Sequence, residues 1–201
     1  MNETIQKMLE RRSIRKYKKD PIPEEVLTTI IEAGIHAASG RNIQTPIVVA
    51  VENAEDVAAL SKANAAVMGS TNDPFYGAPV VLAVLAEKTA GTYVYDGSLV
   101  MGNLMLAAHA CGVGSCWIHR AREVFSQPEW IEWLHKIGVE AKVEGIGFCI
   151  LGYADCDLPK APPRREKRVF RVSNIGFAHT KRYILTDVSL FSIGLKILVK
   201  L

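Results

Sequence analysis

The 201-residue sequence lacks the features by which several protein classes are identified. Its four cysteines form no Cys-x-x-Cys pair and its five histidines are scattered, so we expect no metal site. No apolar run is long enough to span a bilayer, and the polar N-terminus lacks the apolar core of a signal peptide. We therefore expect a cytoplasmic protein with reduced thiols and no membrane partner.

Two catalytic fingerprints are also missing. No Gly-x-Gly-x-x-Gly opens a helix after a first strand, which argues against the common dinucleotide-binding fold. No Gly-x-Ser-x-Gly is present, which weakens a hydrolase interpretation. The net charge is only +3, too mild for a dedicated nucleic-acid binder, so we expect no nucleic-acid partner.

What the sequence does contain is enough apolar material for a sizeable core, with 49% hydrophobic and 22% charged residues. Short β-branched runs predict buried strands, and apolar residues at helical spacing predict helices between them. Strands are expected at 46–53, 80–87, 143–153 and 169–172, and residues 113–118 are expected to form a short strand or a loop. Helices are expected at 4–12, 23–39, 54–69, 95–112 and 130–138. Asn53 should cap one helix, and Ser126 with Glu129 should form a capping box. This alternation indicates an α/β or α+β class.

The expected helix over 95–112 is apolar on almost every side. Such a helix is buried on every side, either in the middle of a fold or across a subunit interface. Its small residues would allow another helix to approach closely.

Positive charge is concentrated in two places. The basic segment, residues 11–19, holds six basic side chains, and a later basic loop carries Arg164, Arg165 and Lys167. Both can converge on one anion, since the arginine fork suits a phosphate. Two alternatives remain open: the loops are simply solvated, or they form a module that binds a phosphorylated ligand or RNA without turnover.

A polar turn, residues 39–45, lies between these clusters and just before an expected strand. Turn formation explains its Ser, Gly and Asn residues. Arg41 and Gln44 need another explanation, and a polar heterocycle with several carbonyls and ring nitrogens would suit them.

Five segments in order resemble the nitroreductase family of FMN-dependent NAD(P)H oxidoreductases. They are RRSIRKY, AASGRNIQTP, DGSLVMGNLMLAAHACGVGSCWI, GIGFCILGY and PPRREKRVF. The resemblance covers residues 3–172. It implies an α+β fold with a mixed sheet flanked by helices, and an intertwined homodimer that binds two FMN molecules at its interface.

The resemblance also implies roles for particular residues. Arg11, Arg12 and Ser13 should meet the FMN phosphate, and Arg15 should reach the N1/O2 edge of the ring. Arg15 is thus the candidate for stabilising the reduced flavin, although no residue is a certain catalyst. The other implied cofactor-binding residues are Ser39, Asn42 and Gln44, in part from the other subunit; Trp117, Ile118 and His119 near flavin N5; and Arg164 or Arg165 at the phosphate. Asn64 is a further candidate.

The implied chemistry is hydride transfer from NAD(P)H to flavin N5, followed by reduction of a small, flat acceptor such as a nitroaromatic or quinone in ping-pong turnover. Other flavin reactions within the family are an alternative.

Residues 1–172 should form the FMN-binding domain, and residues 173–201 an extension. That extension has three open interpretations: a membrane-surface helix, an arm across the dimer, or unselected sequence.

Overall fold

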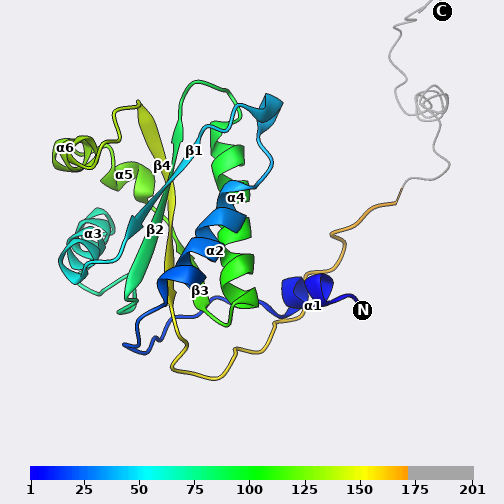
Figure 1. Cartoon of the computed structure of the whole chain (residues 1–201). Helices are drawn as coiled ribbons and strands as arrows, with labels where there is room; N and C mark the ends of the chain where they lie inside the picture. Colours follow the sequence, from blue (N-terminus) through cyan, green and yellow to red (C-terminus); the bar gives the residue numbers. More distant parts are fainter. Residues whose placement is uncertain (172–201) are drawn as a thin grey trace, which may run out of the picture. The chain divides into compact units, whose positions relative to one another are not determined.

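The strands of the core unit, residues 1–161, form an antiparallel sheet in the order β1-β2-β4-β3 (Figure 1). The computed structural model describes residues 1–171. The strands are β1 (Pro46–Val51), β2 (Val80–Glu87), β3 (Gly114–Ile118) and β4 (Val143–Gly152). The helices are α1 (Glu3–Glu10), α2 (Glu24–Ile35), η1 (Gly40–Asn42), α3 (Ala54–Val67), α4 (Tyr93–Ala110), α5 (Ala121–Val124) and α6 (Pro128–Lys136). The predicted α+β class is confirmed, although the strands of the described residues pair only in antiparallel fashion and not as the expected mixed sheet.

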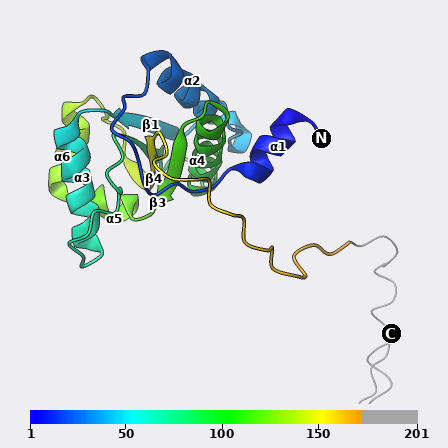
Figure 2. The same cartoon turned by 90° about the horizontal axis from the view of Figure 1, so that it is seen from below.

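Helices cover both faces of the sheet, α2 and α4 on one face and α3, α5 and α6 on the other (Figure 1). Figure 2 shows the same three layers from below. The two-residue period of β2 explains this arrangement, because successive side chains of a strand point to opposite faces. Val81, Ala83 and Leu85 belong to the core beneath α3 and α5. Leu82 and Val84 belong to the core beneath α2 and α4.

Helix α4 lies close to its neighbours at two glycines. A Cβ at Gly97 would lie 2.6 Å from Ile146 Cγ1, and a Cβ at Gly34 would lie 2.3 Å from Leu104 Cδ2. Gly97 therefore allows α4 to approach β4, and the close approach of α2 and α4 depends on Gly34 of α2 and not on a glycine of α4.

The outer side of α4 is exposed in the single chain, so burial in the middle of the fold is wrong for this side, and burial across a subunit interface stays a prediction. Tyr95 is 71% exposed and Leu99 is 50% exposed. On α1, which stands beyond α4 and away from the sheet in both views (Figure 2), Ile5, Met8 and Leu9 are exposed as well. The two helices thus present apolar side chains to solvent, and exposed apolar surface is a feature of interaction sites.

Two local predictions are wrong. The hydroxyl of Ser126 donates to the carbonyl oxygen of Glu123 at 2.8 Å, and the N-cap of α6 is Gln127, without a side-chain hydrogen bond. Residues 169–171 form no strand. The cap at Asn53 is confirmed, because its Oδ1 accepts from the backbone N–H of Asp56 at 2.8 Å.

The second unit begins at Pro162, and its described residues 162–171 are exposed and contain neither helix nor strand. The predicted extension, 173–201, lies outside the described residues. Within residues 1–171, every helix is too short or too polar to cross a membrane.

Candidate functional site

The basic segment lies along the outer edge of β3 and the end of β4. A parallel bridge joins Ser13 to Ser115, and the backbone N–H of Ile14 donates to the Ser115 carbonyl at 2.9 Å. Further along, Tyr17 bridges Ala154, and its buried hydroxyl donates to the carbonyl of Ile14 at 2.6 Å. Burial raises the pKa of the Tyr17 hydroxyl. These contacts fix the backbone from which the arginines project.

Two arginines at the start of the basic segment keep buried nitrogen atoms that have no hydrogen-bond partner among residues 1–171. They are Nη1 of Arg11 and Nε of Arg12. Arg12 uses its Nη1 for the carbonyl oxygens of Leu9 and Arg11, both at 2.7 Å, and so closes the C-terminus of α1. Arg15 is exposed. A buried, unpaired guanidinium N–H is costly, so this corner suits an anion.

The end of β3 is held from the α3 side by Asn64, which is fully buried. Its Nδ2 donates to the carbonyl oxygen of His119 at 2.7 Å, across 55 positions of sequence, and its Oδ1 has no hydrogen-bond partner within residues 1–171. The predicted residues Trp117, Ile118 and His119 end β3 here, and Arg120 follows with a left-handed backbone, φ 76°. We call residues 119–120 the β3–α5 turn.

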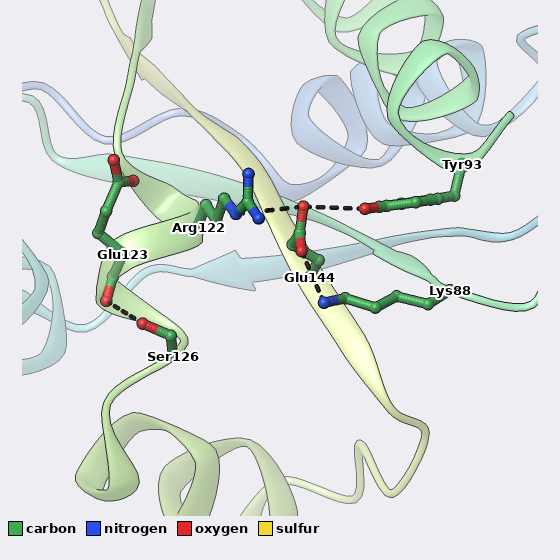
Figure 3. A network of polar contacts seen from close by, with 6 residues as sticks. All are labelled: Lys88, Tyr93, Arg122, Glu123, Ser126 and Glu144. Atoms are coloured by element: carbon green, nitrogen blue, oxygen red, sulfur yellow. Dashed lines mark hydrogen bonds and ion pairs between the residues drawn. The ribbon is translucent and has the colours of Figure 1, made fainter. Parts of the chain in front are cut away.

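The same turn is held from the β4 side. A Cβ at Gly145 would lie 2.3 Å from the carbonyl carbon and oxygen of Ala121, so β4 touches the backbone of α5 directly. Beside it, the buried carboxylate of Glu144 binds three groups from different elements (Figure 3). These are Lys88 Nζ at 2.6 Å, the hydroxyl of Tyr93 at 3.1 Å and Arg122 Nε at 3.5 Å. The hydrogen bond from Lys88 lowers the pKa of Glu144, against the effect of burial.

The polar turn, residues 39–45, lies at the N-terminal end of α4. The backbone N–H of Gly40 donates to Oδ1 of the buried Asp96 at 3.0 Å, and the hydroxyl of Thr92 donates to Oδ2 at 3.0 Å. Ser39 Oγ accepts from the backbone N–H of Gln44, whose side chain donates to Asn42. Arg41, Asn42 and Gln44 all have positive φ, between 53° and 57°. Residues other than glycine hold such conformations only where the surroundings impose them.

The structure thus brings some predicted site residues together and separates others. Ser13 contacts Ser115, and four residues after Ser115, directly past the end of β3, lies His119, about 13 Å away at strand spacing. The polar turn is anchored at Asp96. Near the far end of α4, burial lowers the pKa of His109, and the nearby charges of Lys7, Arg11 and Arg12 lower it further. Thirteen helical residues separate Asp96 from His109, about 20 Å. The two groups therefore lie at opposite ends of α4 in one chain.

Arg164 and Arg165 belong to the second unit, where both are exposed. Their convergence with Arg11 on one anion stays a prediction.

Two residues that organise the site were not singled out from the sequence. Asp96 was the only acidic residue in the apolar run 93–110, and a lone carboxylate in such a helix signals a buried partner. Glu144 gave no comparable signal, because it stands at the start of a strand where acidic residues are common on the surface. Its partners come from segments up to 56 positions away.

Known proteins resemble this chain in both sequence and fold. The family model described as the Nitroreductase family matches residues 8–135. An NADPH-flavin oxidoreductase from Vibrio harveyi is 30% identical over 175 residues, which are 82% of this chain and 70% of that protein. A nitroreductase with bound FMN from Bacteroides fragilis superposes with a TM-score of 0.79 at 28% identity, over 86% of this chain and 100% of that one. A nitroreductase with bound FMN from Desulfitobacterium hafniense gives 0.76 at 26% identity, with the same coverage.

Proposed function

Because this chain belongs to the Nitroreductase family, we propose that it is an FMN-dependent oxidoreductase that takes electrons from NADH or NADPH. With FMN bound, hydride transfer from the nicotinamide to flavin N5 and reduction of a second substrate become possible at one site. The protein's own contribution is to bind, orient and electrostatically tune the cofactor. The following paragraphs assign these tasks to residues.

One observation carries the proposal: in the described part of the chain, polar atoms are buried without hydrogen-bond partners at both ends of the path along β3. Nη1 of Arg11 and Nε of Arg12 offer N–H donors at one end, where a phosphate would accept them. Oδ1 of Asn64 offers an acceptor at the other end, where a ring N–H would donate. Donors for an anion and an acceptor for a heterocycle are what FMN requires, and Ser13 lies beside the phosphate end.

Arg15 is our candidate for stabilising the negative charge that reduction adds to the flavin ring. It lies in the basic segment two residues after Ser13, and within residues 1–171 its guanidinium forms no ion pair. A fixed cation near that charge raises the reduction potential without a proton being moved.

The cofactor site is completed by a second copy of the chain. Ser39, Asn42 and Gln44 lie about 20 Å from the arginine corner along α4, so in one chain they do not share the phosphate end of an FMN molecule with Arg11. The exposed apolar sides of α1 and α4 supply a surface for a homodimer. In that dimer the polar turn of one subunit meets the basic segment and the β3–α5 turn of the other.

We assign the second substrate to small, flat acceptors such as nitroaromatics and quinones. The donor leaves before the acceptor binds, so turnover is ping-pong. Initial rates at several fixed acceptor concentrations should therefore give parallel double-reciprocal lines, and intersecting lines would contradict this order.

The first test is colour. Protein purified without added cofactor should be yellow, and anaerobic NADH or NADPH should bleach it. A colourless protein whose ligand affinity falls steeply with salt would instead support a binding module without turnover.

The second test concerns the phosphate end. Arg11→Ala should weaken FMN binding roughly tenfold or more, since a charge-assisted hydrogen bond is lost. Arg165→Ala tests the second basic loop in the same way. Lys16→Ala is the matched control, because Lys16 lies in the same segment but pairs with Asp155 at 2.9 Å. If Lys16→Ala and Arg11→Ala weaken binding equally, general charge and not a phosphate contact is responsible.

A further inference from the structure

Arg120 has a backbone conformation that favours glycine, with φ 76° and ψ 16°. A residue with a Cβ is destabilised there by about 1 kcal/mol. The conformation is imposed from two sides, by the hydrogen bond from Asn64 to His119 and by the contact of Gly145 with Ala121. The fold therefore fixes the direction of the chain at residue 120, whatever side chain stands there.

The side chain of Arg120 is partly buried, yet within residues 1–171 no carboxylate pairs with it and no carbonyl accepts from its guanidinium. Arg122, two residues later, contrasts with it, because Arg122 is 71% exposed on its side chain and lies 3.5 Å from the carboxylate of Glu144 (Figure 3). Withdrawing a guanidinium from water without an anionic partner costs free energy. Of these two neighbouring arginines, only Arg120 lacks an internal anion.

We propose that Arg120 binds the diphosphate of the nicotinamide dinucleotide donor, an inference that rests on the proposed function. Arg120 directly follows Trp117–His119, the residues assigned to the flavin ring. The nicotinamide must lie against that ring for hydride transfer, which brings the phosphates attached through its ribose near the ring's rim. The planar guanidinium fork matches phosphate oxygens in a bidentate arrangement. Every molecule of NADH or NADPH carries this anion, whereas a flat acceptor need carry none.

The decisive variant is Arg120→Gly. Glycine is the favoured residue at this φ, so the variant should be at least as stable to heat as the parent protein. A loss of function in it is then not a loss of folding. Arg120→Lys keeps the charge but not the fork, and Arg122→Gln is the matched control on the same stretch of chain.

The measurements use the dimeric protein with FMN bound. Binding of ADP-ribose, which carries the diphosphate but no nicotinamide, is measured by calorimetry. The donor's apparent dissociation constant is obtained from the rate of anaerobic flavin bleaching against NADH and, separately, against 1-benzyl-1,4-dihydronicotinamide, which has no phosphate. Arg120→Gly should weaken ADP-ribose and NADH binding by roughly ten- to hundredfold, the range of a charge-assisted contact. The affinities of Arg120→Lys for ADP-ribose and NADH should lie between those of Arg120→Gly and the parent protein. The affinities of Arg122→Gln should stay within about twofold of the parent protein.

Three results would overturn the assignment. If Arg120→Gly weakened the binding of 1-benzyl-1,4-dihydronicotinamide as much as that of NADH, the substitution would have disturbed the geometry of the turn and not a phosphate contact. An equal loss in Arg122→Gln would indicate general charge. If Arg120→Gly left donor binding unchanged but weakened the binding of a carboxylate-bearing acceptor, Arg120 would be assigned to acceptor binding instead. Failure of the proposed function is separate from these, since the parent protein itself would then hold no flavin or would not bleach.

Discussion

The side-chain amide of Asn64 donates a hydrogen bond to the carbonyl oxygen of His119 at 2.7 Å, and this bond joins α3 to the end of β3. Both the proposed cofactor site and the proposed donor contact depend on the turn that this bond holds. Asn64→Leu should lower the free energy of unfolding by about 1–3 kcal/mol, because a buried carbonyl loses its donor. It should also weaken FMN binding. Chemical denaturation and FMN titration measure the two effects.

The control for that variant is Asn103→Leu. Asn103 makes the same kind of bond, from Nδ2 to the carbonyl oxygen of Ala33 at 3.2 Å, but it joins α4 to α2. It should cost stability without changing the affinity of the folded protein for FMN. If Asn64→Leu binds FMN like the parent protein, Asn64 supports the fold only.

Glu144→Gln should lower the stability at pH 7 by about 1–2 kcal/mol, because Lys88 and Arg122 lose a shared anion while the shape of the side chain is kept. The pKa of Glu144 is lowered in the folded state, so its contribution is fully present above the ordinary carboxyl pKa. That contribution disappears as pH falls through the lowered folded-state pKa. Urea denaturation of both proteins between pH 7 and pH 3.5 should therefore show the difference shrinking at the acid end.

A difference that stays constant over this pH range would contradict the assignment of the ionised state to Glu144. The control is Glu132→Gln, which removes an exposed pair with Lys136 at 2.9 Å on α6. Exposed pairs of this kind contribute little to stability, so this variant should follow the parent protein at every pH.

Leu99→Lys should convert the proposed dimer to monomers. Leu99 is half exposed on the outer side of α4, and a symmetric interface would contain the added charge twice. The dissociation constant of the dimer should rise by roughly a hundredfold or more, with loss of FMN from the monomers. Sedimentation velocity and flavin absorbance measure both.

Ile131→Lys is the matched control for that change, because Ile131 is exposed to a similar extent on α6, on the opposite face of the sheet (Figure 1). It should remain dimeric and yellow. A dimeric, FMN-loaded Leu99→Lys protein would remove α4 from the interface.

Gly147→Ala should displace the indole of Trp117, since the added Cβ would lie 2.2 Å from Trp117 Nε1. Overpacking of this kind costs about 1–3 kcal/mol. Near-ultraviolet circular dichroism and FMN affinity should both change. Gly91→Ala is the control, because nothing lies within 4 Å of the position its Cβ would take. Unchanged dichroism in Gly147→Ala would mean that the indole is not fixed against β4.

Several features of the fold were predictable because they depend on neighbours in sequence. The alternation in β2 assigns its residues to two cores, and the Asn53 cap requires only a side chain and an N–H three residues later. The Ser126 cap failed although its pattern was correct. The hydroxyl of Ser126 instead donates a hydrogen bond to the carbonyl oxygen of Glu123 in α5. A sequence pattern shows which hydrogen bonds a side chain can form with nearby backbone groups, but it does not show which of them forms.

The candidate site was predictable only in part. The arginines and the polar turn were identified from charge and residue type, whereas their roles at the flavin and residues 117–119 came from the resemblance to a family. The bond from Asn64 to His119 and the pairing of Glu144 with Lys88 were not, since each joins residues more than 50 positions apart.

By itself, the sequence determined the succession of helices and strands, the two-faced sheet and the family, because periodicity and short motifs record the local preferences of the backbone and the burial of each face. Tertiary structure alone decided that α4 places the polar turn and the basic segment at opposite ends, that its outer side stays exposed, and that within residues 1–171 Arg120 lacks the carboxylate that Arg122 has. The physical reason is that these relationships depend on distances between segments remote in sequence, which no local preference specifies.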